Sequence, residues 1–235
     1  NSLTPQLIEE LHEGLSFCEE REECRVIVLN GQAGFFCTGM DLANAVEQQG
    51  KAGDDPLLYM NLLKRFTQTP RAVVSKVDGK VLAGGVGLVA TSDLVVSSPR
   101  STFGLSEALW GLLPAMVAPF LVRRVGFQPA YAMTLSTETL RAPDALRVGL
   151  IDKMAEDVDA ALAVLLRRMV RLDPLTIADL KAYFRNLWAL SPEVERAAVQ
   201  EFQRLASQPR VQKNIKEFVS EGRLPWEGST AEDSL

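Results

Sequence analysis

The first third of the chain predicts helices alternating with buried strands. Apolar residues recur at helical spacing near the start, at Leu3, Leu7, Ile8, Leu11, Leu15 and Cys18. Thr4 is the predicted cap of this helix and Pro5 its first residue. Continuous apolar runs at 25–30 and 71–77 predict buried strands, and a helical pattern at 56–66 lies between them. This alternation is typical of an α/β fold.

The rest of the chain predicts a change from mixed structure to helices. Residues 80–88 are predicted to open a helix of small residues after a turn at 78–79, and 93–97 reads as a further buried strand. An apolar helix is predicted from Pro114, and mostly helix from Val158 onward, with interruptions at three prolines, Pro174, Pro192 and Pro209. The polar stretch 47–55 predicts an irregular segment.

Length and composition fit one large α/β domain with a helical appendage. The chain has 235 residues, 47% of them hydrophobic, and a net charge of −5, which argues against a nucleic-acid partner. Its three cysteines form neither a metal-binding spacing nor a disulfide framework, which favours the reducing cytoplasm. No apolar run approaches the roughly 20 residues that span a bilayer, so no membrane association is expected.

The scarcity of histidine limits the chemistry. His12 is the only one, and its neighbours Glu9, Glu10 and Glu13 predict a solvated surface position. Catalytic triads, Cys-His pairs and histidine-rich metal sites are therefore disfavoured, and no metal is expected. Acid/base work falls to Glu, Asp, Lys, Tyr or Cys.

The glycines at 84–87 allow a nucleotide-binding interpretation. Residues 85–90 fit the pattern G-x-G-x-x-G/A, and Glu107 follows about twenty residues later, as a ribose-binding acid would. However, the turn at 78–79 separates the preceding strand from the glycines, and Glu107 does not close an obvious second strand. A nucleotide-binding oxidoreductase therefore remains only a distant alternative.

Several motifs in sequence order resemble the crotonase (enoyl-CoA hydratase/isomerase) superfamily. They read FFCTGMDL at 35–42, GKVLAGGVGL at 79–88, SDLVV at 92–96, FGLSE at 103–107, GLLP at 111–114, RAPDA at 141–145 and VGLID at 148–152. The resemblance covers roughly residues 2–155. It implies a crotonase-like ββα superhelix core at 1–156, with the family's N-terminal hairpin apparently missing, and a helical trimerisation or lid region at 157–235.

The resemblance also implies a mechanism. The backbone N–H groups of Met40 and Gly84 would stabilise a thioester enolate, assisted by the dipole of the helix that Gly84 enters. Glu107 would be the catalytic acid/base. Hydratases of the family carry a second glutamate where this chain has Gly87, which cannot transfer a proton, so one carboxyl must take the α-proton and return it to the departing hydroxyl. The plainer alternative is that these glycines only permit tight helix packing.

Further motifs lie at 80–103, 106–107, 111, 114, 119–121, 123–124, 133–135 and 224–227. On these residues the chain resembles, within the superfamily, the dehydratases of polyketide β-branching cassettes most closely. That resemblance implies a hydro-lyase that converts 3-hydroxy-3-methylglutaryl on an acyl carrier protein to 3-methylglutaconyl. It implies no cofactor beyond the phosphopantetheine of the carrier protein or of coenzyme A, and a homotrimer. Cations proposed to meet an acidic carrier protein are Lys64, Arg65, Arg71, Lys213, Lys216 and Arg223.

Five residues are candidates for substrate binding. Lys80 is the candidate partner of the distal carboxylate, and Tyr59 is expected to cover the pocket and donate a hydrogen bond. Cys37 is expected in the pocket wall, and Trp110 and Gly87 complete the set. Solvent exposure of Lys80 and helix packing of Tyr59 are the alternatives.

Two other functions stay open. One is a different crotonase reaction, either decarboxylation of a glutaconyl thioester or double-bond isomerisation. The other is a non-catalytic subunit that binds acyl thioesters.

Overall fold

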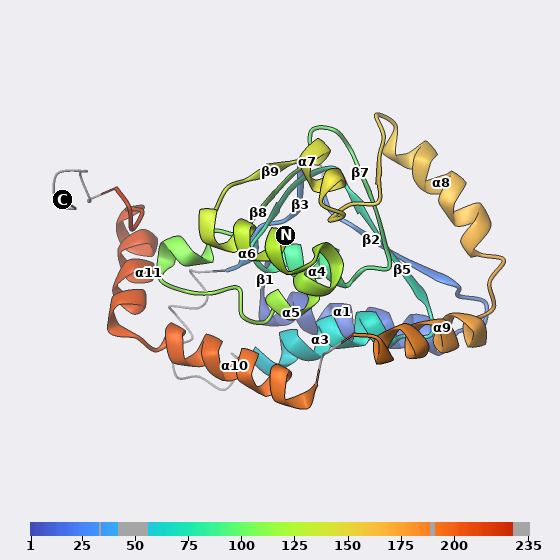
Figure 1. Ribbon diagram of the computed structural model, residues 1–235, viewed down its shortest axis with the longest axis horizontal. Coiled ribbons are helices and arrows are strands. Elements are labelled where there is room, and N and C mark those ends of the chain that lie inside the picture. Colours follow the sequence, from blue (N-terminus) through green and yellow to red (C-terminus); the bar gives the residue numbers. More distant parts are fainter. Residues whose placement is uncertain (33, 42–55, 189–190, 228–235) are drawn as a thin grey trace.

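Two four-stranded sheets form the centre of the computed structural model, which describes residues 1–32, 34–41, 56–188 and 191–227 (Figure 1). The predicted irregular stretch 47–55 and Leu42 lie outside these residues. The first sheet has the order β10-β7-β5-β2 and is parallel throughout. Its strands are β2 (Val26–Asn30), β5 (Ala72–Val77), β7 (Leu94–Ser97) and β10 (Lys153–Met154).

The second sheet has the order β3-β6-β8-β9, and only its β8·β9 pair is antiparallel. Its strands are β3 (Gly34–Cys37), β6 (Gly79–Leu82), β8 (Thr102–Gly104) and β9 (Leu140–Arg141). A separate parallel pair joins β1 (Ser2–Leu3) to β4 (Gly39–Met40), so the start of the chain lies beside the segment that carries Met40.

The chain passes repeatedly from the first sheet directly into the second. This happens between β2 and β3, β5 and β6, and β7 and β8. Helices α3 (Pro56–Gln68) and α4 (Gly84–Thr91) follow the first two of these strand pairs. The predicted ββα superhelix core is confirmed. Strand β6 was not predicted, because four residues ahead of a glycine-rich helix carry too little periodicity to identify a strand.

A corner between the sheets explains one glycine of the motif. Gly79 has a φ of +140°, and a Cβ there would lie 2.2 Å from the carbonyl carbon of Gly34. The Gly79 N–H donates to Ser101 Oγ at 3.1 Å in the next corner. Only glycine fits where two corners are stacked this closely.

The helices confirm most of the predicted pattern. Helix α1 (Pro5–Glu19) begins as expected, with Thr4 Oγ1 accepting from the Leu7 N–H at 3.1 Å. The remaining helices are η1 (Glu107–Trp110), α5 (Ala118–Val125), α6 (Phe127–Ser136), α7 (Ala142–Arg147), α8 (Val158–Met169), α9 (Pro174–Asn186), α10 (Pro192–Ala206) and α11 (Pro209–Glu221). The three prolines predicted to interrupt the carboxy-terminal helices are the first residues of α9, α10 and α11, where a missing N–H costs no helix hydrogen bond.

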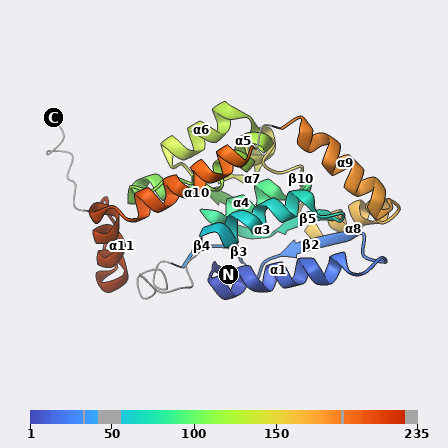
Figure 2. The ribbon, with the colours of Figure 1, turned by 90° about the horizontal axis from the view of Figure 1, so that it is seen from below.

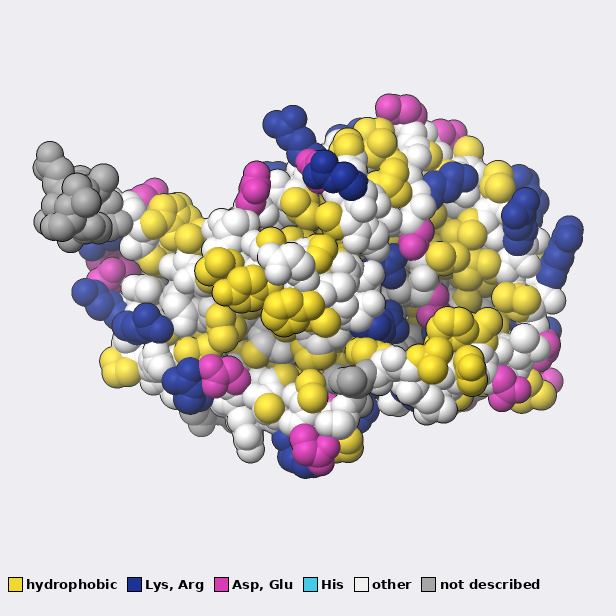
Figure 3. Space-filling view, in the orientation of Figure 1, with side chains coloured by type: hydrophobic (Ala, Val, Ile, Leu, Met, Phe, Trp, Pro, Cys, Tyr) yellow, Lys and Arg dark blue, Asp and Glu magenta, His cyan; other side chains and the backbone are white. Residues whose placement is uncertain are grey.

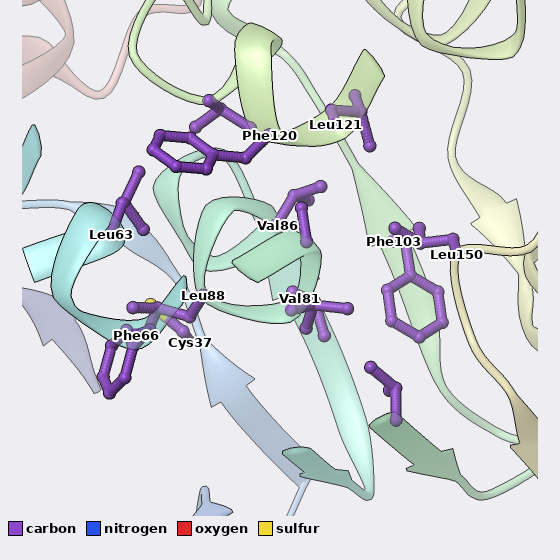
Figure 4. Packing of buried hydrophobic residues seen from close by; sticks show 14 of the residues in the cluster. Cys37, Leu63, Phe66, Val81, Val86, Leu88, Phe103, Phe120, Leu121 and Leu150 are labelled. Atoms are coloured by element: carbon purple, nitrogen blue, oxygen red, sulfur yellow. The ribbon is translucent and has the colours of Figure 1, made fainter. Parts of the chain in front are cut away.

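The core is built around α4 (Figure 4). Val86 on α4, Val81 on β6, Phe103 on β8 and Phe120 on α5 are all fully buried. Helix α3 packs against α1, α4, α9 and α10, and Figure 2 shows it between α1 and α10. Among the described residues, no helix is both long and apolar enough to cross a membrane.

His12 is not the solvated residue that the sequence predicted. Its Nε2 lies 3.1 Å from the Leu58 carbonyl oxygen of α3, and its Nδ1 lies 3.1 Å from Arg65 Nη1. Since Arg65 can only donate, Nδ1 accepts, and the proton on Nε2 donates to the Leu58 carbonyl oxygen. His12 therefore joins α1 to α3 in a part-buried contact. The acidic neighbours in sequence point elsewhere on the helix.

Two helices present exposed apolar faces. Phe127, Tyr131 and Leu135 lie four residues apart on α6, with exposures of 69%, 52% and 68%. Leu180, Tyr183, Phe184 and Leu187, on and just after α9, are also exposed. Apolar side chains gather over α6 and near α9 on the face shown in Figure 3.

Lys181 fastens α9 to the core, and its loss should destabilise the fold. The buried ammonium lies 2.7 Å from Asp93 Oδ2 and 3.0 Å from the Phe66 carbonyl oxygen. Lys181→Ala should lower the free energy of unfolding by roughly 2–3 kcal/mol, because it leaves a part-buried carboxylate without its cation. Urea unfolding measures this. The control Lys213→Ala, at a lysine with a 72% exposed side chain, should cost less than about 0.5 kcal/mol. Equal effects would contradict the proposed anchor.

Candidate active site

A cavity of about 640 Å³ lies where η1, the start of α4 and the β1·β4 pair meet helices α3, α10 and α11. Its walls are mainly apolar. The polar side chains among the described lining residues are Ser2, Thr38, Asp41, Tyr59, Ser106 and Glu107, and none of these is a lysine or arginine. Such a cavity suits an acyl chain that is held by a few directed polar groups.

Glu107 brings an acid/base group into this cavity. It is the first residue of η1, which follows β8 and ends at Gly111, where φ is +82°. Burial raises the pKa of Glu107 from its ordinary 4.5 to about 7. Its buried Oε2 has no hydrogen-bond partner among the described residues. A carboxyl group that titrates near neutral pH and keeps one oxygen unengaged is suited to exchange protons with a substrate.

The two predicted oxyanion residues meet at the cavity wall. Met40 and Gly84 both line it. Gly39, with a φ of +83°, lies directly against the start of α4, since a Cβ on it would be 2.7 Å from Ala83 Cβ and 3.6 Å from the Gly84 nitrogen. Gly84 is the first residue of α4, and the helix leaves the N–H groups of its first turn without intrahelical partners. The structure therefore brings both predicted N–H donors to one side of the cavity.

Ala83 gives this wall a strained backbone. Its φ of +49° and ψ of −123° are rare for a residue with a side chain. Such conformations cost about 1–3 kcal/mol and persist only where the surroundings impose them. Here the Ala83 N–H donates to the Gly104 carbonyl oxygen of β8 at 2.8 Å. With these backbone angles, Ala83 alone makes the turn from β6 into α4.

Tyr59 lines the cavity from α3 and is 7% exposed. Its hydroxyl donates to the Gly84 carbonyl oxygen. Burial raises the pKa of the phenol well above its usual value, and the nearby Cys37 and Glu107 add to the rise. Tyr59 therefore remains a neutral donor at physiological pH.

Two of the candidates for substrate binding, Cys37 and Gly87, lie behind the cavity wall. Neither is among the described lining residues. Cys37 is 2% exposed and lies behind Gly85, whose Cβ would be 2.8 Å from Cys37 Cβ. Burial raises the pKa of its thiol, so the group stays protonated. Gly87 is buried beneath Tyr59. Both residues shape the layer behind the wall.

Trp110, a further candidate for substrate binding, lies in the wall and connects the site to the end of the chain. Its ring packs edge-on against Phe218 of α11, with centroids 5.0 Å apart, and against Trp226 at 5.9 Å. Phe202 of α10 and Phe218 and Val219 of α11 also line the cavity. The sequence prediction missed these three, because helical periodicity shows that a face is apolar but not which element it covers.

Lys80 is not among the described lining residues. It shares a face of β6 with Leu82, which does line the cavity, but it lies two residues farther from α4. Its side chain is exposed, and its ammonium lies 5.7 Å from the centroid of the Phe35 ring. The structure therefore offers no contact between Lys80 and the cavity.

The nucleotide-binding alternative also lacks the geometry it needs. Residues 78–79 do separate β5 from the glycines, as predicted, but the unpredicted strand β6 leads into Gly84 through Ala83 alone. However, β7, the strand that follows α4, belongs to the other sheet. A dinucleotide fingerprint requires a βαβ unit with both strands in one sheet, and this segment does not form one.

Comparisons with known proteins agree with this geometry. The family model described as enoyl-CoA hydratase/isomerase matches residues 1–229. The bacillaene synthase dehydratase PksH of Bacillus subtilis is 35% identical over 231 residues, which cover 97% of this chain and 88% of that protein.

Solved structures give the same result. A crystal structure of B. subtilis PksH superposes with a TM-score of 0.90 at 33% identity, covering 96% of this chain and 90% of that one. A crystal structure of an enoyl-CoA hydratase from Mycobacterium avium gives a TM-score of 0.81 at 32% identity, covering 95% and 87%. The predicted fold and the prediction of an enzyme of the hydratase type are confirmed. The chain is thus a member of the enoyl-CoA hydratase/isomerase family, the crotonase superfamily.

Proposed function

We propose that this enzyme dehydrates a 3-hydroxyacyl thioester. The observation that carries the proposal is Glu107, whose pKa of about 7 and unengaged Oε2 lie in the same cavity as Met40 and Gly84. One carboxyl and two backbone donors are the groups that a stepwise elimination through an enolate requires.

In the proposed reaction, Glu107 performs both proton transfers. Its carboxylate takes the α-proton, and the electron pair of the broken C–H bond moves onto the thioester carbonyl oxygen. The N–H groups of Met40 and Gly84 stabilise that oxyanion, each by about 3–4 kcal/mol. The enolate then forms the α,β double bond and releases the β-hydroxyl, to which Glu107 returns the proton. Water leaves, and the carboxylate is restored.

The proposed substrate is a 3-hydroxy-3-methylglutaryl group, and the product a 3-methylglutaconyl group. The similarity to a bacillaene synthase dehydratase over 97% of the chain supports a place in polyketide β-branching. Because the described lining lacks lysine and arginine, we propose neutral donors for the distal carboxylate, among them the hydroxyl groups of the wall. Ser2 Oγ and Thr38 Oγ1 lie 3.1 Å apart in the wall, and Ser106 adds a third hydroxyl.

The proposed carrier is an acidic acyl carrier protein, with coenzyme A as the alternative thioester handle. Three of the cations predicted to meet it have partners within the chain: Lys64 pairs with Glu195, Arg65 with Glu19, and Arg71 donates to backbone carbonyls of residues 18, 19 and 21. Lys213 and Arg223 also pair with carboxylates of α11, Glu217 and Glu221, but their side chains are largely exposed. Lys216 is exposed on the same helix, which lines the cavity. These three remain the proposed contacts.

We also propose a homotrimer, with residues 157–235 serving as trimerisation and lid region. The exposed apolar faces of α6 and α9 support an association between copies. The positions of Phe202 and Phe218 over the cavity support the lid. The free thiols of Cys18, Cys24 and Cys37 support the reducing cytoplasm as the compartment.

Glu107→Gln should abolish turnover and leave the fold intact. The amide keeps the volume of the side chain but cannot exchange the proton, so the rate should fall roughly 10²–10⁴-fold. Intact-mass analysis of carrier-bound 3-hydroxy-3-methylglutarate shows the loss of water directly.

The wild-type rate should rise with pH and reach half its maximum near pH 7, because the reaction starts from the carboxylate. If the Glu107→Gln variant turned over at the wild-type rate, Glu107 would have no part in the mechanism. If the wild-type enzyme decarboxylated its substrate without dehydrating it, the alternative crotonase reaction would be favoured.

The same substitution should stabilise the protein, and more at high pH. A carboxyl whose pKa rises from 4.5 to about 7 on folding incurs no penalty below pH 4.5, and the penalty is complete above pH 7. Glu107→Gln should therefore gain roughly 2–3 kcal/mol over wild type between pH 4.5 and pH 8, since one pKa unit is worth about 1.4 kcal/mol. Urea unfolding at both pH values measures the gain. The control Glu138→Gln, at an exposed carboxyl, should show no such trend, and a constant difference for Glu107→Gln would contradict its raised pKa.

Lys80→Ala should change turnover less than about threefold, because the ammonium lies outside the described cavity lining. A lysine paired with the distal carboxylate would instead lose roughly ten- to a thousandfold, from the penalty of leaving a desolvated charge unpaired. Rates with 3-hydroxy-3-methylglutaryl and with a carboxylate-free 3-hydroxyacyl thioester separate the two cases. A large loss confined to the first substrate would restore Lys80 as the carboxylate partner.

A further inference from the structure

The hydroxyl of Tyr59 occupies the space where a side chain at position 87 would begin. A Cβ built on Gly87 would lie 2.2 Å from Tyr59 Oη, far inside van der Waals contact. The same Cβ would be 3.1 Å from Val117 Cγ2 and 3.3 Å from Leu63 Cδ1. As long as the Tyr59 hydroxyl keeps this place, only glycine fits at position 87. We refer to Tyr59 and Gly87 together as the packed unit.

The same hydroxyl holds the first turn of α4. It donates to the Gly84 carbonyl oxygen. Gly84 and Gly85 are consecutive and have no side chains to limit their backbone angles. The peptide before Gly84 is held within α4, because the Ala83 carbonyl oxygen accepts from the Val86 N–H at 2.9 Å, and the Ala83 N–H is bonded to β8. Tyr59 supplies the corresponding contact on the other side of Gly84.

Tyr59 is itself held firmly, because α3 is tied to three other helices. The Leu58 carbonyl oxygen lies 3.1 Å from His12 Nε2 of α1, and Lys64 lies 2.7 Å from Glu195 of α10. The ammonium of Lys181 on α9 donates to the Phe66 carbonyl oxygen at 3.0 Å. A helix fixed at successive turns holds its side chains with the accuracy that a positioning role needs.

We propose that Tyr59 is a positioning residue, which aims the Gly84 N–H at the thioester oxygen by holding the Gly84 carbonyl and occupying the space above Gly87. The proposal rests on the proposed function only in placing an oxyanion donor at Gly84. It assigns Tyr59 no proton transfer, since its hydroxyl proton is directed at a backbone carbonyl. Loss of the hydroxyl should therefore weaken polarisation of the bound thioester without changing the titration of Glu107.

Tyr59→Phe tests this, because it removes the hydroxyl and keeps the ring. With carbon-13-labelled butyryl-CoA as probe, infrared spectroscopy should show the bound carbonyl stretch displaced to lower wavenumber in wild type and in Glu107→Gln. In Tyr59→Phe the displacement should be smaller at equal occupancy. kcat should fall roughly ten- to a hundredfold, as expected when a catalytic group is misplaced, while KM stays within about threefold and the pH midpoint remains near 7.

These readouts separate the inference from the proposed function. A wild-type carbonyl displacement in Tyr59→Phe would overturn the positioning role, and so would a shifted pH midpoint, which would mean that Tyr59 acts on Glu107 instead. If the enzyme dehydrates no 3-hydroxyacyl thioester, yet Tyr59→Phe weakens the carbonyl displacement, the proposed function fails and the inference stands.

Gly87→Ala provides an independent test of the packed unit. Its methyl group should push the Tyr59 hydroxyl away from Gly84 and cause the same loss of kcat as Tyr59→Phe. The double variant should then be no slower than the worse single variant, because both substitutions break one contact. The control Gly14→Ala, where the added methyl meets nothing within 4 Å, should behave as wild type. Multiplicative losses in the double variant would overturn the inference.

Discussion

The close approach of two backbone segments, 39–40 and 83–84, is the constraint on which the rest of the site depends. A side chain at Gly39 would collide with Ala83, and a side chain at Gly85 would collide with Cys37. Small residues therefore let β4 and the start of α4 pack backbone against backbone, with no side chain between them. The strain at Ala83 is tolerated because the corners between the two sheets fix where β6 ends. The superhelix thus sets the separation of the two proposed donors before any substrate arrives.

The second consequence of this architecture is a mainly apolar cavity around one carboxyl group. Apolar walls cannot solvate the charge on Glu107, so the group is less acidic than in water. The ionised state of Glu107 is thus less stable in the fold than in water, which suits the base proposed for this position. Enzymes commonly give up stability at their active sites in this way.

The sequence predicted much of the fold because its strongest signals are local. Apolar runs identified β2, β5 and β7, and Thr4 with Pro5 located the start of α1. The resemblance placed Met40, Gly84 and Glu107 in one site, and the structure brings them to one cavity. Contacts between distant segments were not readable. His12 reaches α3 across 46 residues, and Lys80 lies two residues too far along β6. Nothing local to Gly87 reveals that Tyr59 covers it, because that contact depends on how α3 packs on α4.

The cavity is lined by two stretches of the chain that differ in their proposed roles. The proposed chemical groups all precede residue 108, whereas Phe202, Phe218 and Val219 line the cavity from α10 and α11. These two helices lie near the carboxy terminus (Figure 1). Trp110 connects the two stretches, since it lies three residues after Glu107 and its ring packs on Phe218 of α11. Substitutions in α10 and α11 can therefore reshape the acyl chamber while the proton-transfer apparatus stays unaltered. Such a division separates the fit of the substrate from the proposed chemistry, since the tail shapes the cavity and the earlier residues supply the reacting groups.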